Sequence, residues 1–147
     1  MHLSTRMRYG TRALLHLALH EEQGPCSVGE VAEALGLSAK YLEALLNALR
    51  RAGLVQSLRG AGGGYRLARS PEEITLRDAF WALEGLEGFV PCTTSPEACP
   101  QADLCVMQEV WSGLYATCLD FLASYTLADL ARRARERQAG QALMYYL

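Results

Sequence analysis

Residues 27–67 have the sequence SVGEVAEALGLSAKYLEALLNALRRAGLVQSLRGAGGGYRL, and this stretch decides the predicted fold. Ser27, followed three residues later by Glu30, is a capping box that opens a short helix. Gly36 allows a tight turn, and Ser38 caps a second, leucine-rich helix. Two short helices joined by a glycine-containing turn are typical of a helix-turn-helix.

A glycine-rich segment follows the second helix. Residues 54–58 and 65–67 alternate loosely between apolar and polar side chains, and the glycines of 60–64 lie between them. We predict two strands joined by a glycine-rich loop, with Arg59 and Arg66 at its base. A phosphate-binding loop is excluded because no helix opens directly after the glycines and no Gly-Lys-Ser/Thr follows. A hairpin placed after a helix-turn-helix makes a winged helix.

Helical spacing continues on both sides of this stretch. We predict an N-terminal helix over about residues 5–22 and, after the hairpin, a helix capped by Thr75. A proline-rich loop then precedes a long helix, and Thr126 caps a final helix. The apolar residues that recur at helical spacing in the long helix are Trp111, Leu114, Tyr115, Cys118 and Leu122.

The composition is that of a soluble globular protein, since half of the 147 residues are hydrophobic and a fifth are charged. No stretch has the apolar length of a membrane span or the pattern of a signal peptide, so we expect a cytoplasmic protein that does not contact membranes.

The net charge of −2 is distributed unevenly along the chain. Residues 1–70 carry nine basic and five acidic side chains, whereas residues 71–147 carry five basic and eleven acidic side chains. A polyanionic partner therefore suits the first half.

The second predicted helix has a polar outer face once its leucines are turned inward. Asparagine and arginine pair with adenine and guanine edges, while lysine and arginine also bind phosphates. Glu43 would repel phosphate unless it faces a cytosine amino group or water. We predict that this face and the hairpin loop contact double-stranded DNA, and the alternative is a solvated helix surface. The candidate residues are Ser38, Lys40, Tyr41, Glu43, Asn47, Arg50, Arg51, Arg59, Gly60 and Gly62.

Three of the five cysteines fall within fourteen residues, as Cys92-x6-Cys99-x5-Cys105, on the proline-rich loop. Thiols stay reduced in the cytosol, so metal or redox chemistry is favoured over disulfides. Soft thiolates select iron–sulfur clusters or zinc, and the paired C-x2-C spacing that zinc sites favour is absent. We predict an iron–sulfur cluster, with two-iron and four-iron forms both open. Redox-active thiols, another metal and structural cysteines remain alternatives.

Several stretches resemble the IscR-like (Rrf-two) family of bacterial regulators. The resemblance runs from Leu3 to about residue 130, and RGAGGGY at 59–65 is its most specific part. It implies a dimer whose long helix packs against its partner's, two winged helices on a palindromic operator, and a cluster ligated by the loop. It also implies that Tyr9 and Ser4 or Thr5 approach phosphate, with a packing role for Tyr9 as the alternative. The other resembling stretches are Leu3-Ser4-Thr5 with Arg8-Tyr9, SAKYLE at 38–43 and LRRAGLV at 49–55.

The fold class that we predict is mostly α with a small β-hairpin, namely a winged helix-turn-helix plus a long dimerisation helix. This helix spans about residues 105–124. The predicted units are a DNA-binding domain over 1–85, a cysteine-bearing cluster loop over 86–104, and the dimerisation helix with a C-terminal helix over 105–147.

The chain departs from the best-known pattern of this family at two places. The gap between the first two cysteines is one residue longer, and Gln108 stands where a ligating histidine is common. An amide is a poor ligand for iron, so the fourth ligand stays open. The candidates are Gln108, Glu109, Asp103, a residue of the partner subunit, and an external thiol or water. The other thiols and the imidazoles, interpreted as packing or surface residues, are Cys26, Cys118, His2, His16 and His20.

The leading hypothesis is a homodimeric transcription regulator whose iron–sulfur cluster senses cluster status, redox stress or nitric oxide, with cluster-assembly proteins as candidate partners. One alternative is a regulator of the same fold that uses zinc or thiol oxidation without a cluster. Another is an iron–sulfur carrier or interaction module that does not bind DNA. An enzyme is disfavoured because the chain has no catalytic triad, no paired carboxylate motif and no catalytic base near the cysteines.

Overall fold

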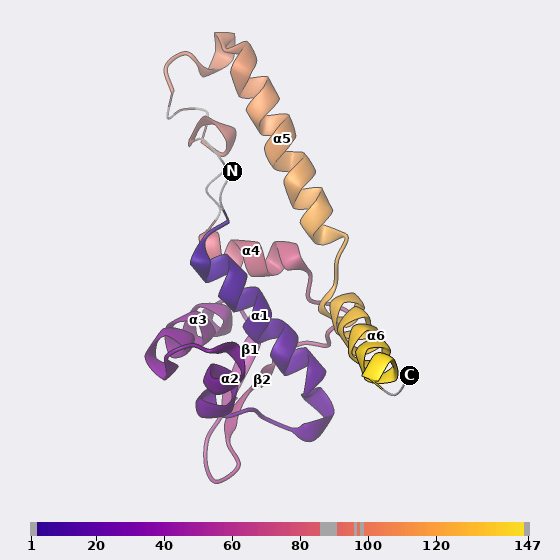
Figure 1. Cartoon of the computed structure of the whole chain (residues 1–147). Helices are drawn as coiled ribbons and strands as arrows, with labels where there is room; N and C mark the ends of the chain where they lie inside the picture. Colours follow the sequence, from indigo (N-terminus) through magenta and orange to yellow (C-terminus); the bar gives the residue numbers. More distant parts are fainter. Residues whose placement is uncertain (1–2, 86–90, 96, 98, 146–147) are drawn as a thin grey trace.

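The computed structural model describes residues 3–85, 91–95, 97 and 99–145. A body formed by the first half of the chain carries a long helical arm, and the last helix returns to the body (Figure 1). This architecture confirms the predicted class, mostly α with a small hairpin. The elements are α1 (Thr5–Leu19), η1 (Glu21–Gln23), α2 (Val28–Leu35), α3 (Ala39–Arg51), β1 (Val55–Leu58), β2 (Gly64–Leu67), α4 (Leu76–Glu84), η2 (Pro91–Thr93), η4 (Ala102–Leu104), α5 (Val106–Ala123) and α6 (Leu127–Tyr145), where η marks a 3-10 turn.

The helix-turn-helix consists of α2 and α3, and its local sequence sets both boundaries. The Ser27 hydroxyl accepts a hydrogen bond from the Glu30 N–H at 3.2 Å, and the Glu30 carboxylate accepts one from the Ser27 N–H at 2.7 Å. Gly36 ends α2 in the left-handed conformation, with φ of 65°. The Ser38 hydroxyl then caps α3 by accepting from the Tyr41 N–H at 3.3 Å. The predicted capping box and turn are therefore confirmed.

The wing is the antiparallel pair β1 and β2, in which Val55 lies opposite Leu67. Strand β2 is joined to the segment before α2, because the backbones of Cys26 and Tyr65 exchange hydrogen bonds of 2.9 and 2.8 Å. Gly64 makes this approach possible: a Cβ at this position would lie 2.4 Å from the Cys26 carbonyl oxygen. Backbone hydrogen bonds thus connect the wing to the start of the helix-turn-helix.

A single apolar core unites the body. The four leucines of α3 that were predicted to face inward are at most 1% exposed, and helix α3 packs against α1. Helix α1 also packs closely on α4, because a Cβ on Gly10 would lie 2.4 Å from a Leu83 methyl carbon. The largest fully buried side chains are Leu14, Val31, Leu42, Leu45, Leu46, Leu49, Leu54, Val55, Ile74 and Leu127.

Helix α5 forms the arm and projects away from the body (Figure 1). It packs on α4 and on η2, and Tyr115 is its buried residue. Helix α6 returns to the body, where Leu127 and Ala131 join the core beside α1. Backbone hydrogen bonds from Leu127 to Ile74 and from Leu76 to Tyr125 hold this junction at 2.9 and 3.0 Å. The arm is therefore anchored at its C-terminal end.

Three details differ from the predictions. Helix α1 ends at Leu19, because the chain continues as the 3-10 turn η1 up to Gly24, where φ is +94°. Helix α6 continues beyond its arginine-rich segment to Tyr145. On α5, Trp111 and Leu114 are exposed, but Tyr115 is buried. The other large apolar side chains exposed along α5 are Val106, Met107, Val110 and Phe121.

Within the described residues, no helix combines the length and apolar character needed to cross a membrane.

Candidate nucleic-acid interface and cysteine loop

Helix α3 presents the polar face that the sequence predicted. Burial of its leucines leaves Lys40, Glu43, Arg50 and Arg51 exposed and Asn47 half-buried. These side chains occupy the outer surface of the second helix of a helix-turn-helix, the element that enters a major groove.

Ser38 and Tyr41 have structural contacts as well. The Ser38 hydroxyl caps α3, and the half-buried Tyr41 ring packs edge-on against Tyr9 of α1, with 6.4 Å between centroids. Both tyrosine rings pack against the core, which supports the packing alternative for Tyr9. Their contact joins the start of α3 to α1.

Two arginines beside Tyr9 extend this surface and were missing from the predicted set. The guanidinium carbons of Arg8 and Arg12 lie 6.0 and 5.5 Å from the centroid of the Tyr9 ring, and both side chains are exposed. Arg8 and Arg12 are four residues apart in α1, so the spacing alone could have placed them on one helix face. Only the tertiary contact with α3 places that face beside the predicted one.

Ser4 and Thr5 have different roles at the start of α1. The Ser4 hydroxyl accepts from the Met7 N–H at 3.0 Å and donates to the Glu84 carboxylate at the end of α4. Thr5, the first residue of α1, is exposed. Of Ser4 and Thr5, the two residues whose hydroxyl was predicted to approach phosphate, Thr5 is the more accessible.

The wing loop depends on glycine for its shape. Gly60 and Gly62 have φ values of 101° and 76°, in the region that other residues rarely adopt. A Cβ on Gly63 would lie 2.3 Å from the Leu58 carbonyl oxygen. Arg59 is exposed at the base of this loop. The loop therefore carries an exposed cation next to a backbone whose only side chain over 60–64 is the methyl group of Ala61, so it can approach another backbone closely.

The charges of this surface are not neutralised by ion pairs in the part of the chain that the structure describes. The ion pairs found there join Arg132 of α6 to Asp129 and to Glu136, each at 3.3 Å. The arginines of α1, α3 and the wing thus keep their positive charge available for a polyanion.

The cysteine loop leads from α4 to α5, and residues 86–90, 96 and 98 lie outside the described residues. Cys92 lies in η2 and is half-buried, as is Cys99, while Cys105 is exposed as the N-cap of α5. None of these thiols forms a disulfide. Among the described residues, no three cysteine, histidine or acidic side chains are gathered closely enough to hold a metal ion.

The chemistry of the three thiols suits a thiophilic group. All three are at least partly accessible, and Cys105 stands at the N-terminus of α5. A cluster would need Cys99 and the side chains of Cys92 and Cys105 to turn toward one common point. Loop ligands can make such a movement more easily than ligands fixed within helices.

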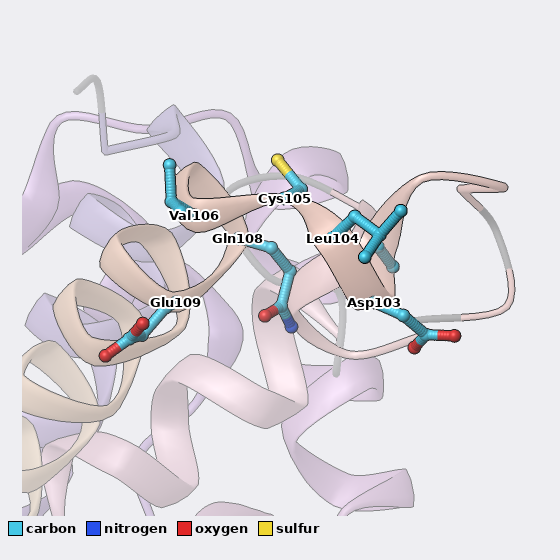
Figure 2. Close-up of a pocket in the computed structure, with 7 residues that line it drawn as sticks. Asp103, Leu104, Cys105, Val106, Gln108 and Glu109 are labelled. Atoms are coloured by element: carbon cyan, nitrogen blue, oxygen red, sulfur yellow. The ribbon is translucent and has the colours of Figure 1, made fainter.

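An open hollow of about 380 Å³ lies at the start of α5 and is lined by residues 102–106, 108 and 109. In Figure 2 the Cys105 thiol points away from the Gln108 amide, and the carboxylates of Asp103 and Glu109 point in different directions. The Gln108 amide nitrogen lies 3.2 Å from the Cys92 carbonyl oxygen and 3.2 Å from the Ser112 hydroxyl. The candidate fourth ligands therefore do not converge on the Cys105 thiol.

The remaining thiols and imidazoles lie elsewhere. Cys26 is buried beneath the wing, and burial, followed by the nearby Glu30 carboxylate, raises its pKa. Cys118 is half-buried on α5. His16 and His20 stack on α1 with ring centroids 4.2 Å apart, and burial, with a smaller effect of His20, lowers the pKa of His16. His2 lies outside the described residues.

Known proteins resemble this chain in sequence and in structure over most of its length. The family model Rrf2, described as an iron-dependent transcriptional regulator, matches residues 3–133. Protein rrf2 of Nitratidesulfovibrio vulgaris is 42% identical over 91% of this chain and 89% of its own length. The structure of T. potens IscR has a TM-score of 0.79 at 40% identity and covers 99% of this chain and 97% of its own. CymR, the global cysteine regulator of B. subtilis, has a TM-score of 0.73 at 38% identity, over 90% and 98%.

Proposed function

This chain belongs to the Rrf2 family of DNA-binding transcriptional regulators, and from that premise we propose that it works as a homodimer on palindromic DNA. We further propose that an iron–sulfur cluster held by Cys92, Cys99 and Cys105 modulates its DNA affinity. The observation that carries the proposal is the combination of two features: a cationic surface on the body that has no ion pairs among the described residues, and three partly accessible thiols on the loop that leads into an exposed apolar helix.

The DNA-binding part of the proposal rests on the geometry of α3 and the wing. Lys40, Asn47 and Arg51 lie on the outer side of α3, and Arg59 lies on the wing. The recognition helices of a two-fold dimer would enter successive major grooves, about 34–36 Å apart, so that the operator repeats the symmetry of the protein. Asn47 and the α3 arginines are suited to base edges, and Arg59 is suited to phosphate.

Replacing Arg51 or Arg59 with alanine is expected to weaken DNA binding by about tenfold or more. Loss of a phosphate contact should also flatten the slope of log affinity against log salt by about one unit per contact, or about two per dimer. The measurement is fluorescence anisotropy on a duplex selected from a random pool, repeated at several salt concentrations. Arg137→Ala is the matched control, because it removes the same charge from an exposed position on α6. Wild-type affinity in both variants would refute this surface.

The dimer proposal rests on the exposed stripe of α5, formed by the exposed Met107, Val110, Leu114 and Phe121 together with the half-buried Cys118. Val110 is 54% exposed, Leu114 41% and Phe121 62%, which is unusual for side chains of this kind along one helix face. The spacing of the five residues is three, four, four and three, so it is the same from either end. Two copies related by a two-fold axis at Leu114 can therefore pair in antiparallel orientation along this stripe.

This pairing makes a test possible, because it places Val110 opposite Cys118 of the partner. The variant Val110→Cys is expected to form a disulfide-linked dimer on mild oxidation, visible on a non-reducing gel. The same substitution in a Cys118→Ser background should not cross-link through this position. Absence of the cross-link, or its persistence without Cys118, would show that the helices pair differently.

The link between the cysteine loop and the DNA surface runs through α1 and α4. The loop begins directly after α4, whose last residue, Glu84, accepts a hydrogen bond from the Ser4 hydroxyl. The Arg6 side chain also donates to the Leu83 carbonyl oxygen at 3.2 Å. Helix α1 in turn carries Tyr9, which contacts Tyr41 of α3. A cluster would supply a redox-sensitive group at the loop, and these contacts would transmit changes in the loop to the DNA-binding surface.

A second candidate function is direct thiol sensing by the same regulator. Two observations favour it: the three thiols are separate in the described structure, and one similar protein is a global cysteine regulator. In that case the loop cysteines, rather than a cluster, would respond to oxidants. Iron and labile sulfide analysis of anaerobically prepared protein distinguishes the two functions.

A further inference from the structure

The side chain of Gln108 connects two segments that carry cysteines. It lies in the first turn of α5, three residues after Cys105, and its amide nitrogen contacts the backbone carbonyl of Cys92 sixteen residues earlier. We propose that Gln108 is a positioning residue, which fixes the Cys92 segment on α5, and that it is not a metal ligand. The proposal deepens the proposed function, since it assigns a role in assembling the thiol site.

The orientation of the Gln108 amide follows from its partners. The Cys92 carbonyl oxygen can only accept a hydrogen bond, so the amide nitrogen must face it. The same nitrogen lies 3.2 Å from the Ser112 hydroxyl, which can accept the second N–H. A flipped amide would place two carbonyl oxygens against each other. Both N–H groups are therefore engaged, and only the amide oxygen is left for other contacts.

The surroundings of Gln108 support an anchoring role. Gln108 is half-buried, and Ser112 is four residues further along α5, on the same helix face. The η2 turn that carries Cys92 packs against α5, so the hydrogen bond secures an existing contact. Figure 2 shows the Gln108 amide and the Cys105 thiol pointing away from each other. Gln108 thus fixes the first cysteine relative to the helix that the third cysteine caps, without facing the third thiol.

The test compares two substitutions. Gln108→Ala removes both hydrogen bonds, whereas Gln108→Glu keeps the size and shape of the side chain but places a carboxylate oxygen against the Cys92 carbonyl. In metal-free, reduced full-length protein, we expect both variants to raise the alkylation rate of Cys92 by about five- to tenfold, as the loss of one to two net hydrogen bonds would allow. Mass spectrometry resolves each site after reaction with iodoacetamide. Cys105 is the internal reference, and Gln101→Ala is the control, since Gln101 is an exposed residue of the same loop.

The glutamate variant separates this role from its alternatives. A space-filling role predicts that Gln108→Glu behaves like wild type, and a ligand role predicts that glutamate retains iron, because a carboxylate is a better iron ligand than an amide. Our proposal predicts that Gln108→Glu loses iron to a chelator as fast as Gln108→Ala or faster. Wild-type Cys92 alkylation in both variants, or wild-type iron retention in Gln108→Glu, would overturn it. The alkylation result requires no cluster, so it distinguishes failure of this proposal from failure of the cluster proposal.

Discussion

Replacing Leu114 with aspartate is expected to convert the dimer into a monomer and to lower the affinity for palindromic DNA by about 100-fold or more. Leu114 is the central residue of the exposed stripe on α5, so a two-fold axis there would bring two introduced carboxylates together. Like charges removed from water repel each other and lack compensating hydrogen bonds. A monomer would keep one winged helix and lose every contact with the second half-site.

The control for this experiment lies on the same helix. Ala116 is exposed and is two residues from Leu114, about 200° around the helix axis, so Ala116→Asp adds the same charge on the opposite side. Light scattering at micromolar concentration measures the mass, and circular dichroism checks that both variants remain folded. A Leu114→Asp protein that stays dimeric, or a wild-type protein that is monomeric, would rule out this interface.

Replacing any one of Cys92, Cys99 and Cys105 with alanine is expected to remove most of the visible absorption and bound iron, a loss of about tenfold, from anaerobically reconstituted protein. Each thiolate supplies a bond to the cluster and compensates part of its charge, so two thiols cannot replace three. Absorption spectroscopy and iron and sulfide analysis on the same samples measure the effect.

The two other cysteines are the matched controls for these substitutions. Cys26 is buried beneath the wing and Cys118 lies on α5, so Cys26→Ala and Cys118→Ala should retain the colour. Colourless wild-type protein after anaerobic reconstitution, with stoichiometric zinc or no metal, would contradict the cluster. It would favour zinc binding or direct thiol sensing, and the DNA-binding proposal would be unaffected.

Local sequence determines the helix-turn-helix and the wing, which is why both could be predicted. Ser27, Glu30 and Ser38 satisfy the free N–H groups of the helix starts, and these interactions span three residues. Gly60 and Gly62 reach a backbone region that other residues avoid. The end of α1 was misplaced, because helical spacing cannot distinguish a last helical turn from the 3-10 turn η1.

Contacts between distant segments could not be predicted from local patterns. The Tyr9–Tyr41 contact, which brings Arg8 and Arg12 beside α3, depends on how α1 packs. The hydrogen bond between Gln108 and the Cys92 backbone spans sixteen residues. Its acceptor is a backbone carbonyl, which every residue has, so the sequence does not indicate it. The apolar stripe predicted on α5 holds in part for a similar reason: Trp111 and Leu114 are exposed, but the pattern could not show that the fold buries Tyr115.

We propose that this protein binds palindromic DNA as a dimer and that its cysteine-bound cluster changes this binding. The most direct test measures the affinity of the full-length protein for a selected palindromic duplex under anaerobic conditions, first with its cluster and then after the cluster is removed from the same sample. We predict that the two affinities differ by about tenfold or more and that a variant with all three loop cysteines replaced by alanine behaves like the cluster-free form. Equal affinity of the iron-loaded and iron-free dimers would show that the cluster does not modulate DNA binding.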